Sequence, residues 1–260
     1  MPEPYPVKWK GDYLFVLRNL VMKDFRIRYR NMSLGVFWSV LNPLVMMAVL
    51  TFVFTKIFKS TIKDFPLFLL CGMVPFNFFS VAWSSATTCI VDNASLIKRV
   101  PFPREIVPIA SVLSTTVHLG TQILLTVVFT LAYGKGVNVN WLWLPVVWGL
   151  AIVFVCGLGL ICSGLNVYLR DMRYIVESSL TVLYWLVPIF YDFSFIPVRF
   201  REIYSLNPIA ALVMAQRNIF MQGRPPAETL LLKLFLSSFG MLAIGLLLFQ
   251  KLKRRFYNYL

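Results

Sequence analysis

Long runs without charged residues alternate along the chain with short segments in which charges and prolines gather. A helix needs about 20 apolar residues to cross the hydrocarbon core of a bilayer. The pattern therefore predicts six transmembrane helices, at residues 34–56, 65–91, 106–133, 141–168, 174–191 and 229–250. Glu177 and Lys233 lie near the start of the fifth and sixth helices, where a charged side chain can still reach the interface. We expect a single all-α integral membrane domain over residues 1–260.

Composition agrees with this pattern. The chain is 58% hydrophobic and only 14% charged, and its mean hydropathy is +0.73. A soluble domain carries about 25% charged residues. A water-soluble core could not bury this much apolar surface, which excludes an ordinary soluble domain. The first apolar run begins more than thirty residues into the chain, behind a basic segment, so no cleavable signal peptide is expected.

Basic residues are distributed unevenly between the two sides that six crossings would create. The side with both termini and the 92–105 segment carries about twice as many lysines and arginines as the other side, and short basic loops stay in the cytoplasm. Both termini are therefore expected to be cytoplasmic. The net charge of +14 then reflects topology and contact with anionic lipid headgroups, and it requires no nucleic acid.

Residues 12–30 precede the first predicted span and have the pattern of an amphipathic helix on the membrane surface. At about 100° per residue, one narrow face carries Asn19, Lys23, Arg26 and Arg30. The opposite face carries Leu14, Leu17, Val21 and Phe25. A basic amphipathic helix beside a span lies in the interface plane. Two roles stay open: an anchor in the lipid alone, or an anchor that also borders a cytoplasmic partner.

The segment between the second and third spans contains "LIKRVPFPREIVP", residues 96–108, with four charges and three prolines. Asp92 or Asn93 can cap a short helix that runs to about Arg99. Val100 precedes a proline and is therefore pushed out of the helical region, which ends that helix. The Pro-Phe-Pro sequence forms a stiff extended elbow before the next span. The residues predict a rigid projection on the cytoplasmic side.

The segment between the fifth and sixth spans, residues 192–227, is long and too apolar for a simple loop. Asn207 followed by Pro208 is typical of a helix N-cap and first turn, and Gly223 is a natural helix end. We expect two short helices within residues 195–223, lying at the outer interface or dipping into the membrane. Irregular backbone at membrane depth must be surrounded by protein or line a water-filled cavity. The segment is therefore a candidate lining for the outer mouth of a pathway.

Aromatic side chains gather just before this outer segment, at Tyr184, Trp185, Phe190 and Tyr191. Tryptophan and tyrosine are enriched at membrane interfaces, so these rings fit an interfacial aromatic belt. They also fit a stacking surface for sugar rings, whose apolar C–H faces pack on aromatic faces. Both interpretations stay open.

Residues for several kinds of chemistry are missing from the sequence. It has no G-x-x-x-x-G-K-[ST] phosphate loop and no paired carboxylates at mid-membrane. The four cysteines have no metal-site spacing and are expected to be buried apolar residues. Glu177 is expected to pair with Arg173 or Arg170, and His118 with Gln122 is expected to hydrogen-bond a neighbouring helix. The pattern favours a transport component without metal, cofactor or catalytic residues, powered by a separate subunit.

Three stretches together resemble the membrane subunit of polysaccharide-exporting ABC transporters, which export O-antigen, capsule and teichoic-acid polymers. They are "LVMKDFRIRYRNMSLGVFWSVLNPL" at 20–44, "NASLIKRVPFPREIVP" at 93–108 and "GLNVYLRDMRYIVE" at 164–177. The resemblance implies a homodimer in the bacterial cytoplasmic (inner) membrane that works with two copies of an ATP-binding subunit. That subunit would bind ATP and Mg. The substrate would be a glycan on a polyprenyl diphosphate or other lipid carrier.

The resemblance also implies roles for particular residues. Coupling to the ATPase falls on the 92–105 segment and the following inner loop, at Leu96, Ile97, Lys98, Arg99, Arg104, Glu105, Arg170 and Asp171. Contact with the lipid diphosphate falls on Arg26, Arg28 and Arg30. The glycan pathway and its outer gate fall on Tyr184, Trp185, Phe190, Tyr191, Asn207 and Pro208. Two alternatives are a related permease for a small drug or lipid, and a membrane enzyme of lipid-glycan synthesis.

Overall fold

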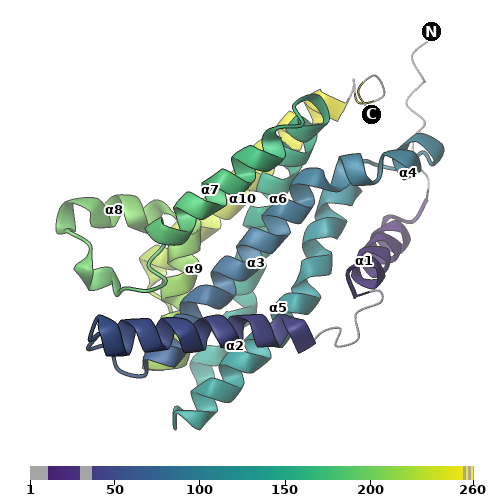
Figure 1. The fold of residues 1–260 in the computed structure, drawn as a ribbon. Coiled ribbons are helices and arrows are strands. Elements are labelled where there is room, and N and C mark those ends of the chain that lie inside the picture. The colour runs from purple at the N-terminus through teal and green to yellow at the C-terminus, as the bar shows by residue number, and fades with distance from the viewer. Residues whose placement is uncertain (1–10, 30–36, 254–255, 257–258, 260) are drawn as a thin grey trace.

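The computed structural model describes residues 11–29, 37–253, 256 and 259. Every regular element in these ranges is a helix, which confirms the all-α class (Figure 1). The helices are α1 (Tyr13–Tyr29), α2 (Phe37–Phe52), η1 (Val53–Ile57), α3 (Phe65–Asp92), α4 (Ala94–Arg99), α5 (Ile106–Ala132), η2 (Val139–Trp143), α6 (Leu144–Tyr168), α7 (Met172–Leu186), η3 (Phe193–Phe195), α8 (Val198–Leu206), α9 (Pro208–Arg217), η4 (Asn218–Gln222) and α10 (Glu228–Leu252).

Five helical segments are long and apolar enough to cross a membrane. They are Phe37–Ile57, Phe65–Asp92, Ile106–Ala132, Val139–Tyr168 and Glu228–Leu252. They correspond to five of the six spans predicted from sequence. The sixth predicted span, 174–191, coincides with α7, which has 15 residues and is about 22 Å long. The hydrocarbon core is about 30 Å thick, so α7 alone falls short and the count of six stays a prediction.

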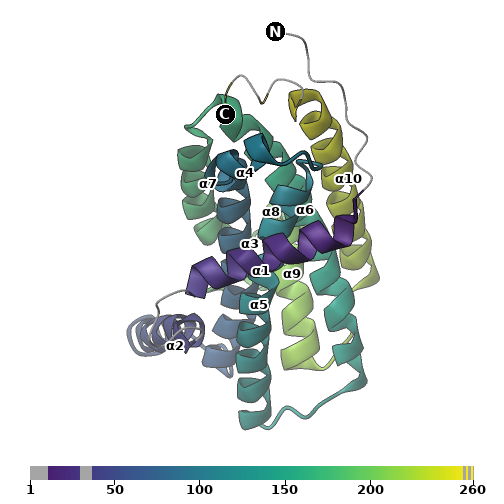
Figure 2. The same cartoon turned by 90° about the vertical axis from the view of Figure 1, so that its right-hand side faces the viewer.

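Helix α3 lies at the centre of the helical bundle (Figures 1 and 2). It packs against α2, α5, α6, α7 and α9. Its side chains are buried along much of its length, from Leu67 near one end to Ile90 near the other. In contrast, α2 crosses the bundle at a steep angle and leaves much of its surface exposed (Figure 1). The core of the protein is therefore organised around α3.

Helices α6 and α10 touch backbone to backbone. A Cβ atom built on Gly245 would lie 2.5 Å from the carbonyl oxygen of Gly157, and one on Gly157 would lie 2.6 Å from the backbone of Met241 and Leu242. Small residues allow helices to approach this closely, and such packing substitutes for the hydrophobic effect inside a membrane. The two glycines therefore set the distance between α6 and α10.

Helix α4, the start of α7 and the last turn of α10 lie at one end of the bundle (Figures 1 and 2). The α2–α3 and α5–α6 connections lie at the other end (Figure 2). We name these the inner end and the outer end. The segments predicted to share the cytoplasmic side thus lie together.

Several local predictions can be compared with the backbone. Helix α4 ends at Arg99, and Val100 is extended with φ −119° and ψ 123°, as predicted. The Asn207 side chain accepts a hydrogen bond from the Ile209 amide at 3.0 Å, which confirms the predicted cap. Gly223 ends η4 with φ 61°. The capping prediction for Asn93 was wrong, because its side chain donates to the Cys89 carbonyl and accepts from Lys23 instead.

We predict that Gly245→Val destabilises the protein and that Gly240→Val does not. Gly240 lies on the same helix with nothing within 4 Å of a built Cβ atom. Overpacking at Gly245 should cost about 2 kcal/mol, because the obstacle is the backbone of α6 and cannot move aside. Thermal unfolding of the two purified variants measures the difference. Equal melting temperatures would contradict the close approach of α6 and α10.

Candidate functional site

The α4 insert has one anchored face and one exposed face. Ile97 is buried and Leu96 is partly buried, in an apolar cluster that includes Leu20 of α1 and Val107 of α5. The next two residues on α4, Lys98 and Arg99, are exposed. Apolar packing therefore fixes the position of α4, while its basic end projects from the inner end of the molecule.

The chain leaves this insert through Arg104 and Glu105, and both contact the end of α10. An Arg104 Nη1–H group donates to the Lys253 carbonyl oxygen at 2.9 Å. The Lys253 ammonium lies 3.0 Å from Glu105 Oε1. These two side chains, assigned to ATPase coupling from the resemblance, thus bind the insert to α10 of the same chain. We name this three-residue contact the α10 latch.

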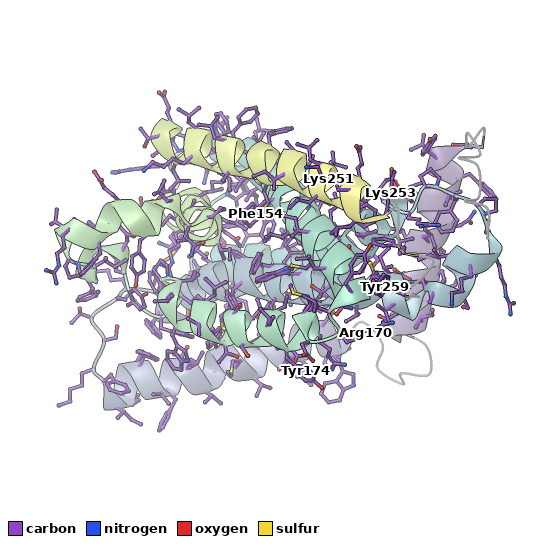
Figure 3. The ribbon with its side chains drawn as sticks, turned by 90° about the horizontal axis from the view of Figure 1, so that it is seen from above. Phe154, Arg170, Tyr174, Lys251, Lys253 and Tyr259 are labelled. Carbon is purple, nitrogen blue, oxygen red and sulfur yellow. The ribbon has the colours of Figure 1, made fainter. Side chains whose placement is uncertain are left out.

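The second inner loop lies between α6 and α7 and also contacts the C-terminal segment. The Tyr168 hydroxyl donates to the Leu252 carbonyl at 2.6 Å. Arg170, which is exposed, donates to the Tyr259 carbonyl at 3.4 Å. Figure 3 shows Arg170, Lys253 and Tyr259 near one another at the inner end. Asp171 is exposed at the N-cap position of α7. The C-terminal segment therefore contacts both predicted coupling loops.

Leu17 and Val21 of the predicted apolar face of α1 are partly buried against the apolar cluster that also holds α4. Leu20 lies between these residues and the basic face, is buried at 7% exposure and belongs to the same cluster as Ile97 of α4 and Val107 of α5. Lys23 donates to Asn93 and lies 3.7 Å from Asp24. Leu14 on the apolar face is 74% exposed. The pattern did not single out Leu20 as the most buried residue of this face because it is one apolar residue among many.

The three arginines assigned to diphosphate contact are only partly described. Arg26 is exposed on α1. Arg28 belongs to the same helix, but its side chain is not described, and Arg30 lies outside the described residues.

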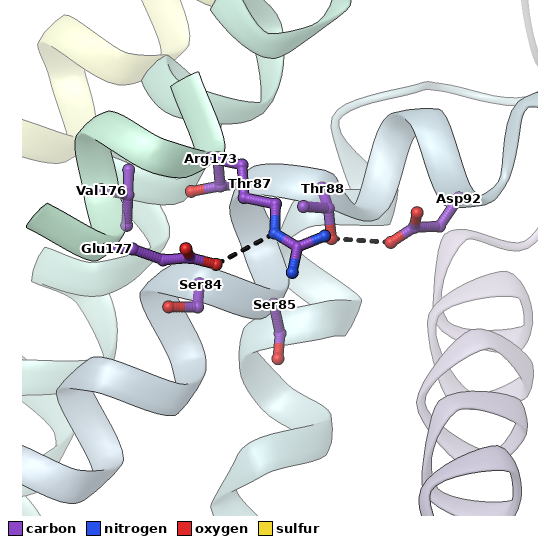
Figure 4. A pocket seen from close by; sticks show the side chains of 8 residues that line it. All are labelled: Ser84, Ser85, Thr87, Thr88, Asp92, Arg173, Val176 and Glu177. Atoms are coloured by element: carbon purple, nitrogen blue, oxygen red, sulfur yellow. Dashed lines mark hydrogen bonds and ion pairs between the residues drawn. The ribbon is translucent and has the colours of Figure 1, made fainter. Parts of the chain in front are cut away.

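A polar groove lies at the inner end, between α3 and its neighbours. It consists of two hollows of about 360 Å³ and 500 Å³ that share Ser85, Thr88 and Asp92. The first hollow, between α3 and α7, is drawn in Figure 4. The second lies between α3, α1 and α5. We name both together the inner groove; its polar lining residues are Lys23, Asp24, Ser84, Ser85, Thr87, Thr88, Asp92, Asn93, Ser111, Ser114, Arg173 and Glu177.

Hydrogen bonds within the inner groove hold its charges in place. Arg173 Nε donates to Glu177 Oε1 at 2.9 Å, which confirms the predicted pairing of Glu177 (Figure 4). The Thr88 hydroxyl donates to Asp92 Oδ2 at 2.7 Å. Sequence reasoning missed this groove, because serine and threonine do not interrupt a run without charges. The signal was the four-residue spacing of Ser84, Thr88 and Asp92 on one face of α3.

The aromatic residues before the outer segment form one cluster. The Tyr184 and Phe190 rings lie 5.0 Å apart, and those of Trp185 and Phe190 lie 5.7 Å apart. Phe190 is buried at 4% exposure, whereas Trp185 is 65% exposed. The Tyr191 hydroxyl donates to the Leu186 carbonyl at 2.9 Å. Trp185 is therefore the most exposed of these rings and could contact a passing molecule. It packs against the buried ring of Phe190.

A buried arginine holds the outer hairpin, α8 and α9, against the bundle. Arg217 at the end of α9 is 6% exposed. Its guanidinium lies 3.4 Å from the centre of the Phe68 ring and donates to the Ile189 carbonyl at 2.8 Å. A Cβ atom on Gly72 would lie 3.2 Å from the Arg217 Nη2 atom. Sequence reasoning counted Arg217 only as an outer charge; its apolar flanks, "ALVMAQRNIFM", were the available signal.

We predict that Arg217→Lys lowers stability, whereas Arg199→Lys leaves it near the wild-type value. Lysine keeps the charge at Arg217 but loses the flat contact with Phe68, at a cost of about 2 kcal/mol for a desolvated pair. Arg199 makes the matching contact with Phe200, at 4.5 Å on an exposed surface. Thermal unfolding compares the two variants. An unchanged midpoint for Arg217→Lys would remove the anchoring role.

The all-helical bundle, with five membrane-length helices, defines a multi-pass membrane protein. In the described part of the chain, no cluster of three or more metal-ligating side chains occurs, and all four cysteines are buried. The family model of ABC-2 type transporters matches residues 16–221. The chain therefore belongs to the ABC-2 type transporter family.

Three relatives cover most of the chain. It is 30% identical over 252 residues to the O-antigen export system permease protein RfbA of Klebsiella pneumoniae, covering 96% of this chain and 97% of that protein. It is 30% identical over 223 residues to RfbA of Myxococcus xanthus, covering 85% and 86%. It is 28% identical over 234 residues to the polysialic acid transport protein KpsM of Escherichia coli, covering 89% and 91%.

Proposed function

We propose that this chain is the transmembrane subunit of an ATP-driven exporter that moves a lipid-linked polysaccharide across the bacterial cytoplasmic membrane. The observation that carries the proposal is the near full-length similarity to O-antigen export permeases. The hydroxyl-lined inner groove and the exposed Trp185 add support, since both suit a sugar polymer. ATP hydrolysis belongs to a separate subunit, because this sequence has no phosphate loop.

In this proposal the chain crosses the membrane six times and both termini are cytoplasmic. The fifth crossing is α7 extended by the buried stretch Val187–Phe190, whose backbone is held by Arg217. The hairpin of α8 and α9 forms the outer gate. Two copies of the chain pair, and the exposed faces of α2 and α7 are available for that contact.

The exposed end of α4 and the Arg170–Asp171 loop provide the contacts for two copies of an ATP-binding subunit. When those subunits close on ATP, α4 moves as a rigid body because Ile97 is packed in the apolar cluster. Helix α3 leads directly into α4, so the motion reaches the centre of the bundle. The basic face of α1, through Arg26, attracts the diphosphate of the lipid carrier.

Disruption of the gene tests the function. We expect the surface polysaccharide to disappear and the lipid-linked polymer to accumulate inside the cell, because synthesis continues without export. A plasmid copy of the chain should restore the surface polymer. The alternative, a permease for a small drug or lipid, predicts normal surface polysaccharide together with altered drug resistance or lipid composition. An unchanged surface polymer in the disrupted strain would contradict polysaccharide export.

A second prediction concerns the α10 latch. Lys253→Met removes the ion pair with Glu105 while leaving the Arg104 contact to the Lys253 carbonyl. We expect export to fall at least about fivefold at normal protein levels, the lower range of measured coupling effects. Lys251→Met, two residues earlier and exposed in the last turn of α10, is the matched control. Equal export by the two variants would contradict a role for the latch in coupling.

A further inference from the structure

The charge of the inner groove is opposite in sign to that of the chain. Its lining has two basic side chains, Lys23 and Arg173, and three acidic ones, Asp24, Asp92 and Glu177. The chain as a whole has a net charge of +14. An acidic lining at the inner end of a strongly basic protein does not follow from topology, because the inner side is where basic residues gather.

Both basic side chains of the groove already have acidic neighbours. Lys23 lies 3.7 Å from Asp24 and also donates to Asn93. Arg173 donates to Glu177 at 2.9 Å. An incoming anion would have to replace these contacts and would also meet Asp92. Two negative charges held a few ångströms apart repel each other, and the repulsion is stronger where less water lies between them. The groove therefore disfavours phosphate and carboxylate groups.

The same lining suits uncharged sugars. Serine and threonine hydroxyls both donate and accept hydrogen bonds, and carboxylates accept them strongly from hydroxyl groups. Ser84, Ser85 and Thr88 offer hydroxyls along one side of α3, and Asp92 and Glu177 provide carboxylates close by (Figure 4). The hollows of about 360 Å³ and 500 Å³ fall in the usual size range of binding pockets.

We propose that the inner groove is a binding subsite for uncharged sugar units of the exported polymer and that it discriminates against acidic sugars. This inference rests on the proposed function and adds the charge class of the sugars. It assigns the specificity to Asp92 and Glu177.

Ser85 provides a direct test because it lines both hollows. The full chain with Ser85→Cys is reconstituted in lipid nanodiscs, and the rate of its modification by a polar thiol reagent is measured. Cys89, which also lines the groove, is replaced by Ala, and the other three cysteines are buried. An uncharged glucose or mannose oligosaccharide should slow the modification about threefold at about twice its dissociation constant, by mass action. A sialic acid oligomer of equal length should not.

Two further variants complete the design. Ser95→Cys, on the exposed side of α4 and outside the groove, should react at the same rate with or without either sugar. In the Ser85→Cys chain, Asp92→Asn with Glu177→Gln should allow the sialic acid oligomer to slow modification, because Arg173 is released and two negative charges are lost. This gain cannot arise from unfolding.

Equal slowing by both oligomers, or by neither, would overturn the inference, as would the absence of a gain in the Asp92 and Glu177 variant. These results are separable from the proposed function. If gene disruption abolishes surface polymer but the groove gives no protection, export stands and the subsite fails. If disruption leaves the surface polymer unchanged, the export function fails whatever the labelling shows.

Discussion

The packing of α3 against five other helices is the contact on which the rest of the structure depends. Inside a bilayer every backbone polar group must be satisfied within the protein, and side-chain packing must replace the hydrophobic effect as the force between helices. Helix α3 meets both demands at once, since it is a continuous helix of 28 residues and is buried along much of its length.

The two ends of α3 carry the features that we connect to function. Near its outer end, Gly72 lets Arg217 and Ile189 come close, so the hairpin of α8 and α9 is fixed there. Near its inner end, Ser85, Thr88 and Asp92 line the groove, and the chain continues into α4.

In the proposed function, this arrangement would provide a physical route from an ATP-binding partner to a sugar polymer. Packed helices switch between discrete positions instead of deforming gradually. A displacement of α4 would therefore be passed to α3 as a whole, and from there to the groove at one end and the Arg217 contact at the other. The α10 latch ties the same insert to the end of the last helix.

The sequence predicted the parts of the fold that depend on local pattern. Five membrane-length helices, the end of α4 at Arg99 and the Asn207 cap all follow from gaps between charges or from adjacent residues. The end of α7 at Leu186 was not predicted, because the stretch Val187–Phe190 carries no charge; the missed signal is Pro188, which pushes Val187 out of the helical region. Contacts between distant residues were also beyond reach: Lys23 binds Asn93 from 70 positions away, and Arg217 lies against Phe68 of α3. The inner groove was missed because the hydroxyls of α3 do not interrupt a run without charges, and because its charged side chains come from three different helices.

Transport by purified components measures the central claim most directly. The chain and its ATP-binding partner are reconstituted in sealed vesicles with a lipid-linked polysaccharide, and the polymer exposed on the far side is measured with and without ATP. We expect transfer that requires both subunits and ATP hydrolysis, and none with the chain alone. Transfer without the partner, or ATP-dependent movement of small lipids but not of the polysaccharide, would contradict it.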